Sequence, residues 1–219
     1  MIIRWISSLF QKRKDKMKKS YLEYNWSPVI NFESGGMFYY NKFLKRVCWP
    51  GGASGLTIGI GADLGYMTKE EFCTYFEHYF DISSASKLKS VIGLKATKAK
   101  NKLSVVRDIE LNWSDAIEAF VQWTLPKFWR LANNLWPGLD SLKEEAQIAL
   151  VSIVFNRGTS TTGTSRAEMR NIKSLVADKD YIGIAQEIRS MKRLWVGKNL
   201  DGLLKRRDVE ADMVESCVK

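Results

Sequence analysis

The sequence predicts an α+β protein in which a small antiparallel sheet lies beside a larger, mainly helical lobe. Glycines and β-forming residues dominate residues 37–65, and Pro50-Gly51-Gly52 provides a turn within them. After Tyr66, apolar residues recur at helical spacing behind capping patterns. The 219 residues are 45% hydrophobic, which is enough to form a sizeable core. We therefore expect one domain over residues 21–219, behind an N-terminal extension of residues 1–20.

The first helix of this domain is expected to begin at Ser27, as N-cap, with Pro28 in its first position. Gly35-Gly36 should end it, which places Glu33 near its C-terminus. Further helix starts are predicted from three capping-box patterns and two single caps: Thr68 with Glu71, Ser141 with Glu144, Ser165 with Glu168, Ser114 and Asp180. Pro126 should kink or break its helix, Gly158 should end the apolar central one, and residues 203–214 should form the last helix.

Residues 1–20 combine an apolar helical face with a strong positive charge. They hold seven Lys and Arg residues against Asp15, a net +6 of the chain's +10. The apolar segment precedes the charges and no small-residue cleavage site follows, so a cleavable secretory signal is not expected. Three interpretations stay open for this extension: it binds an anionic membrane surface, it is a passive tail, or it is a delivery sequence that a partner recognises.

A second basic run extends from Lys87 to Lys102 and Arg107, with no acidic residue inside it. Such a run is usually a solvated helix face. The chain has no motif that reads DNA or RNA, and most of its net charge lies in residues 1–20. Nucleic acid is therefore not an expected partner, and a monomer is expected.

The reactive side chains point to acid–base chemistry by carboxylates. The chain has one histidine and three cysteines without paired spacing, so neither a Ser-His hydrolase nor a metal site is supported, and no cofactor is expected. Glu33, at a helix end among aromatic residues, is a candidate general acid. Asp63, in a glycine turn after a strand, is a candidate general base, and the Thr57 hydroxyl can hold a water molecule.

These residues stand in a recognisable pattern. Glu33-Ser-Gly-Gly, followed by Gly55-Leu-Thr-Ile-Gly-Ile-Gly-Ala-Asp-Leu-Gly65, resembles the active-site hairpin of the T4-type phage lysozymes. The order Glu, Thr, Asp resembles the pesticin-like branch of lysozyme-fold muramidases. The segment 149–158, ending in Phe-Asn-Arg-Gly, and Leu204-Lys-Arg-Arg-Asp-Val-Glu210 resemble that family's central and C-terminal helices. The chain departs from the pattern at Ile60 and Ala62, where Tyr and His are common.

The resemblance, over roughly residues 25–215, implies a lysozyme-like fold with a cleft between the lobes. It implies an inverting muramidase that cleaves the β-1,4 bond between N-acetylmuramic acid and N-acetylglucosamine in peptidoglycan, with Glu33, Thr57 and Asp63 as catalytic residues. Candidate substrate-binding residues are the aromatics Tyr39, Trp49 and Tyr66 for stacking on sugars, and Asn156 and Arg157 at the end of the central helix.

Two other functions stay open at this point. A lytic transglycosylase would use one Glu and no base, and Asp63 argues against it. A catalytically inactive sugar-binding or membrane-associated module is the second alternative. If the chain is a muramidase, it would act in the periplasm or at the wall after lysis or delivery. The sequence leaves open whether it is an endolysin, a bacteriocin or secreted effector with an immunity protein, or an enzyme that remodels its own wall.

Overall fold

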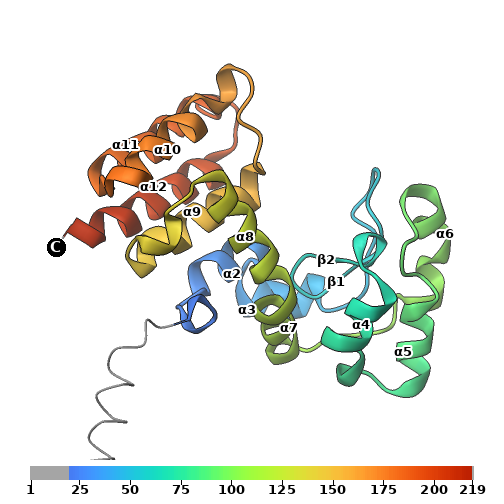
Figure 1. The fold of residues 1–219 in the computed structure, drawn as a ribbon. Coiled ribbons are helices and arrows are strands. Elements are labelled where there is room, and N and C mark those ends of the chain that lie inside the picture. The colour runs from blue at the N-terminus through green and yellow to red at the C-terminus, as the bar shows by residue number, and fades with distance from the viewer. Residues whose placement is uncertain (1–19, 219) are drawn as a thin grey trace, which may run out of the picture.

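The structure, a computed structural model, describes residues 20–218. Helices account for most of this part of the chain, around a two-stranded antiparallel sheet (Figure 1). This arrangement confirms the predicted α+β fold. The predictions for residues 1–19, including membrane binding, lie outside the described residues. None of the described helices is long and apolar enough to cross a membrane.

The first α-helix of the described residues, α2 (Ser27–Ser34), begins and ends close to the predicted positions. Ser27 is its first helical residue and not its cap, and the Asn25 side chain accepts a hydrogen bond from the Ser27 N–H at 3.2 Å. Gly35 ends the helix with a φ of +69°. A side chain at Gly35 would also come within 2.9 Å of Tyr39, so glycine is required here for two reasons.

Residues 36–44 form helix where the sequence analysis predicted a strand. Helix α3 (Gly36–Tyr39) leads into a π-helical segment, Tyr40–Leu44. Tyr40 is fully buried, and its hydroxyl donates a hydrogen bond to the Leu111 carbonyl at 2.8 Å. Contacts with a distant part of the chain thus outweigh the β propensity of the aromatic residues, which is a weak local preference.

The sheet is smaller than predicted. Strands β1 (Thr57–Ile58) and β2 (Ala62–Asp63) pair in register, with Thr57 opposite Asp63 and Ile58 opposite Ala62. The turn between them contains Gly59 and Gly61, both with positive φ. Ile58 and Ala62 are buried, so the hairpin is fixed to the core on one side.

Three helices complete this lobe: α4 (Lys69–Tyr75), α5 (Ile82–Lys89) and α6 (Ala96–Val106). The predicted capping box at Thr68 and Glu71 is confirmed at the start of α4. The basic run lies on α5, α6 and the turn between them.

A long helical segment then runs between the two lobes (Figure 1). It consists of α7 (Trp113–Ala119), a π-helical turn at Phe120–Thr124, and α8 (Leu125–Leu135). Pro126 lies in the first turn of α8, directly after the π-helical turn, where its missing N–H is tolerated. The N-cap of α7 is Asn112 and not Ser114, because the Asn112 side chain accepts from the Asp115 N–H.

The remaining helices form the larger lobe: α9 (Glu144–Arg157), α10 (Ala167–Asp178), α11 (Tyr181–Ser190) and α12 (Asp201–Glu215). Helix α9 is buried from residue 146 to residue 154 and ends at Gly158, as predicted.

Of the predicted helix caps in this lobe, Asp180 is confirmed at the start of α11. The predicted capping boxes at Ser141 and Ser165 are wrong. The Ser141 hydroxyl donates to the Gly138 carbonyl, whereas Glu144 accepts from the Asn25 N–H, and Glu168 pairs with Arg193. The two glutamate side chains make contacts outside their own turn, which the local pattern does not specify.

Candidate active site

Glu33 lies in the last turn of α2 and meets an arginine of α12. Arg206 Nη2 is 2.8 Å from Glu33 Oε1, and the Glu33 side chain remains 26% exposed. The Arg206 guanidinium also lies over the Phe32 ring, 4.8 Å from its centroid. An oxygen of the candidate acid is therefore held by a charged group, while part of the side chain faces solvent.

Arg206 is itself fixed by a buried network. Its Nη2 donates to the carbonyl and hydroxyl of Ser152 in α9, both at 2.9 Å, and its Nε donates to Glu210 at 3.1 Å. Arg207 also binds Glu210, and both of these side chains are completely buried. Burial raises the pKa of Glu210 and lowers that of Arg207, so each side chain depends on its partners to remain charged.

The surroundings of Glu33 differ from those that the sequence suggested. The sequence predicted an aromatic environment formed by Phe32, Phe38 and Tyr39. Phe38 is 83% exposed and Tyr39 49% exposed, whereas Arg206 contacts the carboxyl group. No role for Arg206 or Glu210 was predicted from the sequence. The only signal was the Arg-Arg-x-x-Glu spacing, which marks a helix face but not what that face contacts.

Thr57 and Asp63 are brought together by the hairpin, where they are directly opposite each other. Asp63 lies in strand β2 and not in the glycine turn itself, because it pairs with Thr57. The Asp63 Oδ1 accepts hydrogen bonds from the N–H groups of Gly65, at 2.8 Å, and Gly55, at 3.1 Å. Gly55 also lies 3.2 Å from Oδ2. A Cβ at Gly55 would lie 2.4 Å from Asp63 Oδ1, so the glycine permits this close approach. Among the described residues, no hydrogen bond or ion pair joins Glu33 to the hairpin.

The three candidate stacking aromatics lie in different surroundings. Tyr39 packs against Phe43, with ring centroids 4.7 Å apart. Trp49 is half-buried, and its indole N–H donates to the Ser54 carbonyl. Tyr66 is 58% exposed, with the Lys95 ammonium 3.5 Å from its ring centroid.

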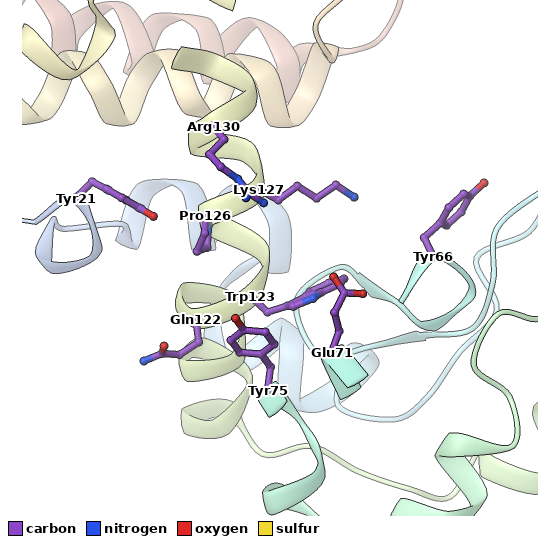
Figure 2. Close-up of a pocket in the computed structure, with 9 residues that line it drawn as sticks. All are labelled: Tyr21, Tyr66, Glu71, Tyr75, Gln122, Trp123, Pro126, Lys127 and Arg130. Carbon is purple, nitrogen blue, oxygen red and sulfur yellow. The ribbon is translucent and has the colours of Figure 1, made fainter. Parts of the chain in front are cut away.

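Tyr66 faces a hollow that contains none of the three candidate catalytic residues. This hollow, of about 440 Å³, lies between α4 and the segment from Gln122 to Arg130 (Figure 2). Figure 2 shows Glu71 of α4 beside Trp123, and Lys127 extending from α8 toward the side where Tyr66 lies. The stacking role of Tyr66 therefore stays a prediction.

Asn156 and Arg157 end α9 and line a separate hollow of about 320 Å³. Asn156 is exposed, whereas Arg157 is buried and donates from Nη2 to the Ser165 carbonyl. Trp195 forms another part of the wall, with its ring 5.1 Å from the Arg157 guanidinium. Trp195 was not predicted from the sequence as a site residue.

Comparison with known proteins agrees with this architecture. The sequence model of the phage lysozyme family matches residues 51–210. The match includes the hairpin with Thr57 and Asp63 and the cluster of Arg206 and Glu210, and it begins after Glu33. No curated protein sequence matches the chain. Because the family match covers well over half of the chain, the chain belongs to the phage lysozyme family, which is a family of peptidoglycan-hydrolysing glycosidases.

Proposed function

We propose that this protein is an inverting muramidase that cleaves the β-1,4 bond between N-acetylmuramic acid and N-acetylglucosamine. In this proposal Glu33 is the general acid, Asp63 is the general base, and Thr57 positions the attacking water molecule. The order Glu33, Thr57, Asp63 supports the pesticin-like branch within the family. The observation that carries the proposal is the partly exposed Glu33 carboxyl group, held by an arginine that a buried network fixes in place.

The contacts of Glu33 fix the orientation of its carboxyl group. Arg206 occupies Oε1, while Oε2 has no hydrogen-bond or ion-pair partner among the described residues. Oε2 is therefore available to face the glycosidic oxygen of a bound sugar chain. A catalytic group must be held in one orientation, and Arg206 provides this because Ser152 and Glu210 restrain its own guanidinium.

The contacts of Asp63 suit a base with one free position. A carboxylate offers about four acceptor positions, and the hydrogen bonds from Gly55 and Gly65 occupy at most three of them. Directly opposite residues in an antiparallel pair have Cβ atoms about 4.5–5.5 Å apart, so one water molecule can contact both Thr57 and Asp63. The Thr57 hydroxyl accepts from or donates to that water, and Asp63 removes its proton as it attacks.

The proposal is tested with Glu33→Gln on purified peptidoglycan. We expect the release of reducing ends to fall about 10²–10⁴-fold, which is the usual contribution of general acid catalysis. Arg206 keeps its hydrogen bonds to Ser152 and Glu210 in this variant, so the fold should be retained. Glu187→Gln is the matched control, because Glu187 is also half-buried on a helix and accepts a side-chain hydrogen bond, from Asn171 at 3.1 Å.

The products decide between the chemical alternatives. Borohydride reduction should convert N-acetylmuramic acid at the new chain ends, and NMR of the first product should show the inverted anomer. A 1,6-anhydro product would establish a lytic transglycosylase instead. Near-wild-type rates for Glu33→Gln would rule out Glu33 as the acid, and failure of the wild-type protein to release any reducing ends would favour an inactive binding module.

A further inference from the structure

The hollow at the C-terminal end of α9 is lined by positive charge. Arg157, Arg166 and Lys198 all contribute to its wall, together with Asn156 and Trp195, and no acidic side chain lines it. Among the described residues, the side chains of Arg166 and Lys198 have no hydrogen-bond or ion-pair partner. A concave site with three cations and no counter-charge favours an anionic ligand.

The positive charge of Arg157 is not balanced by an ion pair with any of the described residues. The residue is only 9% exposed, yet among the described residues no carboxylate forms an ion pair with it. Its Nη2 donates to the Ser165 carbonyl, and its Nε is buried without a hydrogen-bond partner. Native proteins rarely leave a buried guanidinium N–H unpaired, so this atom marks an incompletely satisfied site.

The nearest acidic groups are already engaged. Glu168 binds Arg193 Nε at 2.5 Å, and Glu210 binds Arg206 and Arg207. Burial lowers the pKa of Arg157 to about 10, and the positive charges of Arg166, Arg207 and Arg193 act in the same direction. Glu168 opposes this effect without reversing it. An anion in the hollow would relieve the repulsion among these cations.

We propose that this hollow binds an oxyanion of the wall polymer, a carboxylate or phosphate group carried by the strand that the enzyme cuts. Arg157 and Arg166 would donate to the oxyanion, Lys198 would add charge, and the Asn156 amide would donate a neutral hydrogen bond. This inference rests on the proposed function because it takes the ligand to be part of the substrate.

The position of the hollow connects it to the candidate acid. The Trp195 ring lies between Arg157, at 5.1 Å, and Arg207, at 5.6 Å. Arg207 directly follows Arg206, which binds Glu33. A glycan strand bound in the hollow would therefore lie close to the Arg206–Arg207 pair, and Arg206 holds the candidate acid Glu33. Binding in the hollow should therefore change the KM for the polymer and not kcat, since none of the residues that line the hollow contacts Glu33.

The test uses a pair of substitutions that should not affect folding. Arg157 is buried and its replacement would disturb packing, so Arg166→Gln/Lys198→Gln is the test variant. Lys102→Gln/Lys173→Gln is the matched control, because both lysines are exposed and the loss of charge is the same. Binding is measured by co-sedimentation with insoluble peptidoglycan in the full chain carrying Glu33→Gln, and KM and kcat are measured with Glu33 intact.

Three wall preparations separate the sources of the anion: untreated peptidoglycan, peptidoglycan stripped of stem peptides by an amidase, and peptidoglycan stripped of phosphate polymers by hydrofluoric acid. On the untreated material we expect the test variant to bind roughly five- to tenfold more weakly than the control, with unchanged kcat. The difference should disappear on the preparation that lacks the recognised anion.

Equal binding by the test and control variants on untreated material would overturn the proposal. Because the amidase frees the lactyl carboxylate of N-acetylmuramic acid, a fourth preparation combines both treatments with conversion of these carboxylates to amides. A difference that persists on this preparation would also overturn the proposal, because the polymer then carries no oxyanion. The catalytic proposal can fail separately. If Glu33→Gln still cleaves the polymer, Glu33 is not the acid, while the binding comparison, made at 4 °C in one shared background, still decides whether the hollow takes an anion.

Discussion

Replacing Asp63 separates a catalytic role from a structural one. The Asp63 carboxylate accepts hydrogen bonds from the N–H groups of Gly55 and Gly65, which are both buried. Asp63→Asn keeps the Oδ1 atom that accepts both bonds and removes the basic oxygen. Asp63→Ala removes the acceptor as well. The two variants therefore differ in their effect on the hairpin and agree in the loss of the base.

The hydrogen bonds of Asp63 set the size of the expected changes in stability. Each buried N–H left without an acceptor costs about 1–3 kcal/mol, so Asp63→Ala should lose about 2–6 kcal/mol of unfolding free energy. For a chain of this size, about 2–4 °C of Tm corresponds to each kcal/mol, so its Tm should fall by at least about 4 °C. Asp63→Asn should lose about 1 kcal/mol or less. Loss of the base should lower the rate of both variants by about 10²–10⁴-fold.

The measurements are thermal unfolding and the release of reducing ends from purified peptidoglycan. A stable Asp63→Asn protein with greatly reduced activity would support Asp63 as the base. If Asp63→Asn kept near-wild-type activity, Asp63 would only hold the hairpin, and another group would have to activate the water. If Asp63→Ala were as stable as the wild type, the assignment of its hydrogen bonds would be wrong.

Three further outcomes follow from the structure. Glu210→Gln removes the carboxylate shared by two buried guanidinium groups, so the free energy of unfolding should fall by about 3–5 kcal/mol. Thermal unfolding measures this, and a Tm within about 2 °C of the wild type would contradict it. Hydrogen bonds from Lys45 and Arg46 lower the pKa of the partly exposed Glu110. The stabilisation that Glu110 contributes should therefore be present above the unfolded-state pKa, about 4.3, and be lost as pH falls through the lower folded-state pKa. Wild type and Glu110→Gln should differ in Tm at pH 7, and the difference should shrink as the pH is lowered below the unfolded-state pKa. Deletion of residues 1–20 should leave turnover on isolated peptidoglycan nearly unchanged and reduce sedimentation with anionic vesicles; loss of hydrolysis would make the extension part of the domain, and absence of vesicle binding by the full chain would exclude the membrane role.

Local patterns predicted the elements whose ends depend on neighbouring residues. The capping box of α4, the glycine that ends α9 and the glycine turn between β1 and β2 were all foreseeable, because caps and tight turns are set within a few residues. Predictions were wrong where a side chain contacts a residue that is far away in the sequence. Glu144 binds the Asn25 N–H instead of capping its own helix, and Tyr40 packs under Leu111 in a helix instead of a strand.

The sequence by itself determined the α+β class, the glycine-rich turn that precedes Asp63, and the position of Glu33 at a helix end. These features follow from glycine conformations and side-chain periodicity, which act over short separations. The register that sets Thr57 opposite Asp63 is seen only in the structure. Only the tertiary structure placed Arg206 against Glu33 and gathered Arg157, Arg166 and Lys198 around one hollow. Ion pairs and cavities form between helices that are far apart in the chain, and their geometry depends on how buried faces pack, which no local pattern specifies.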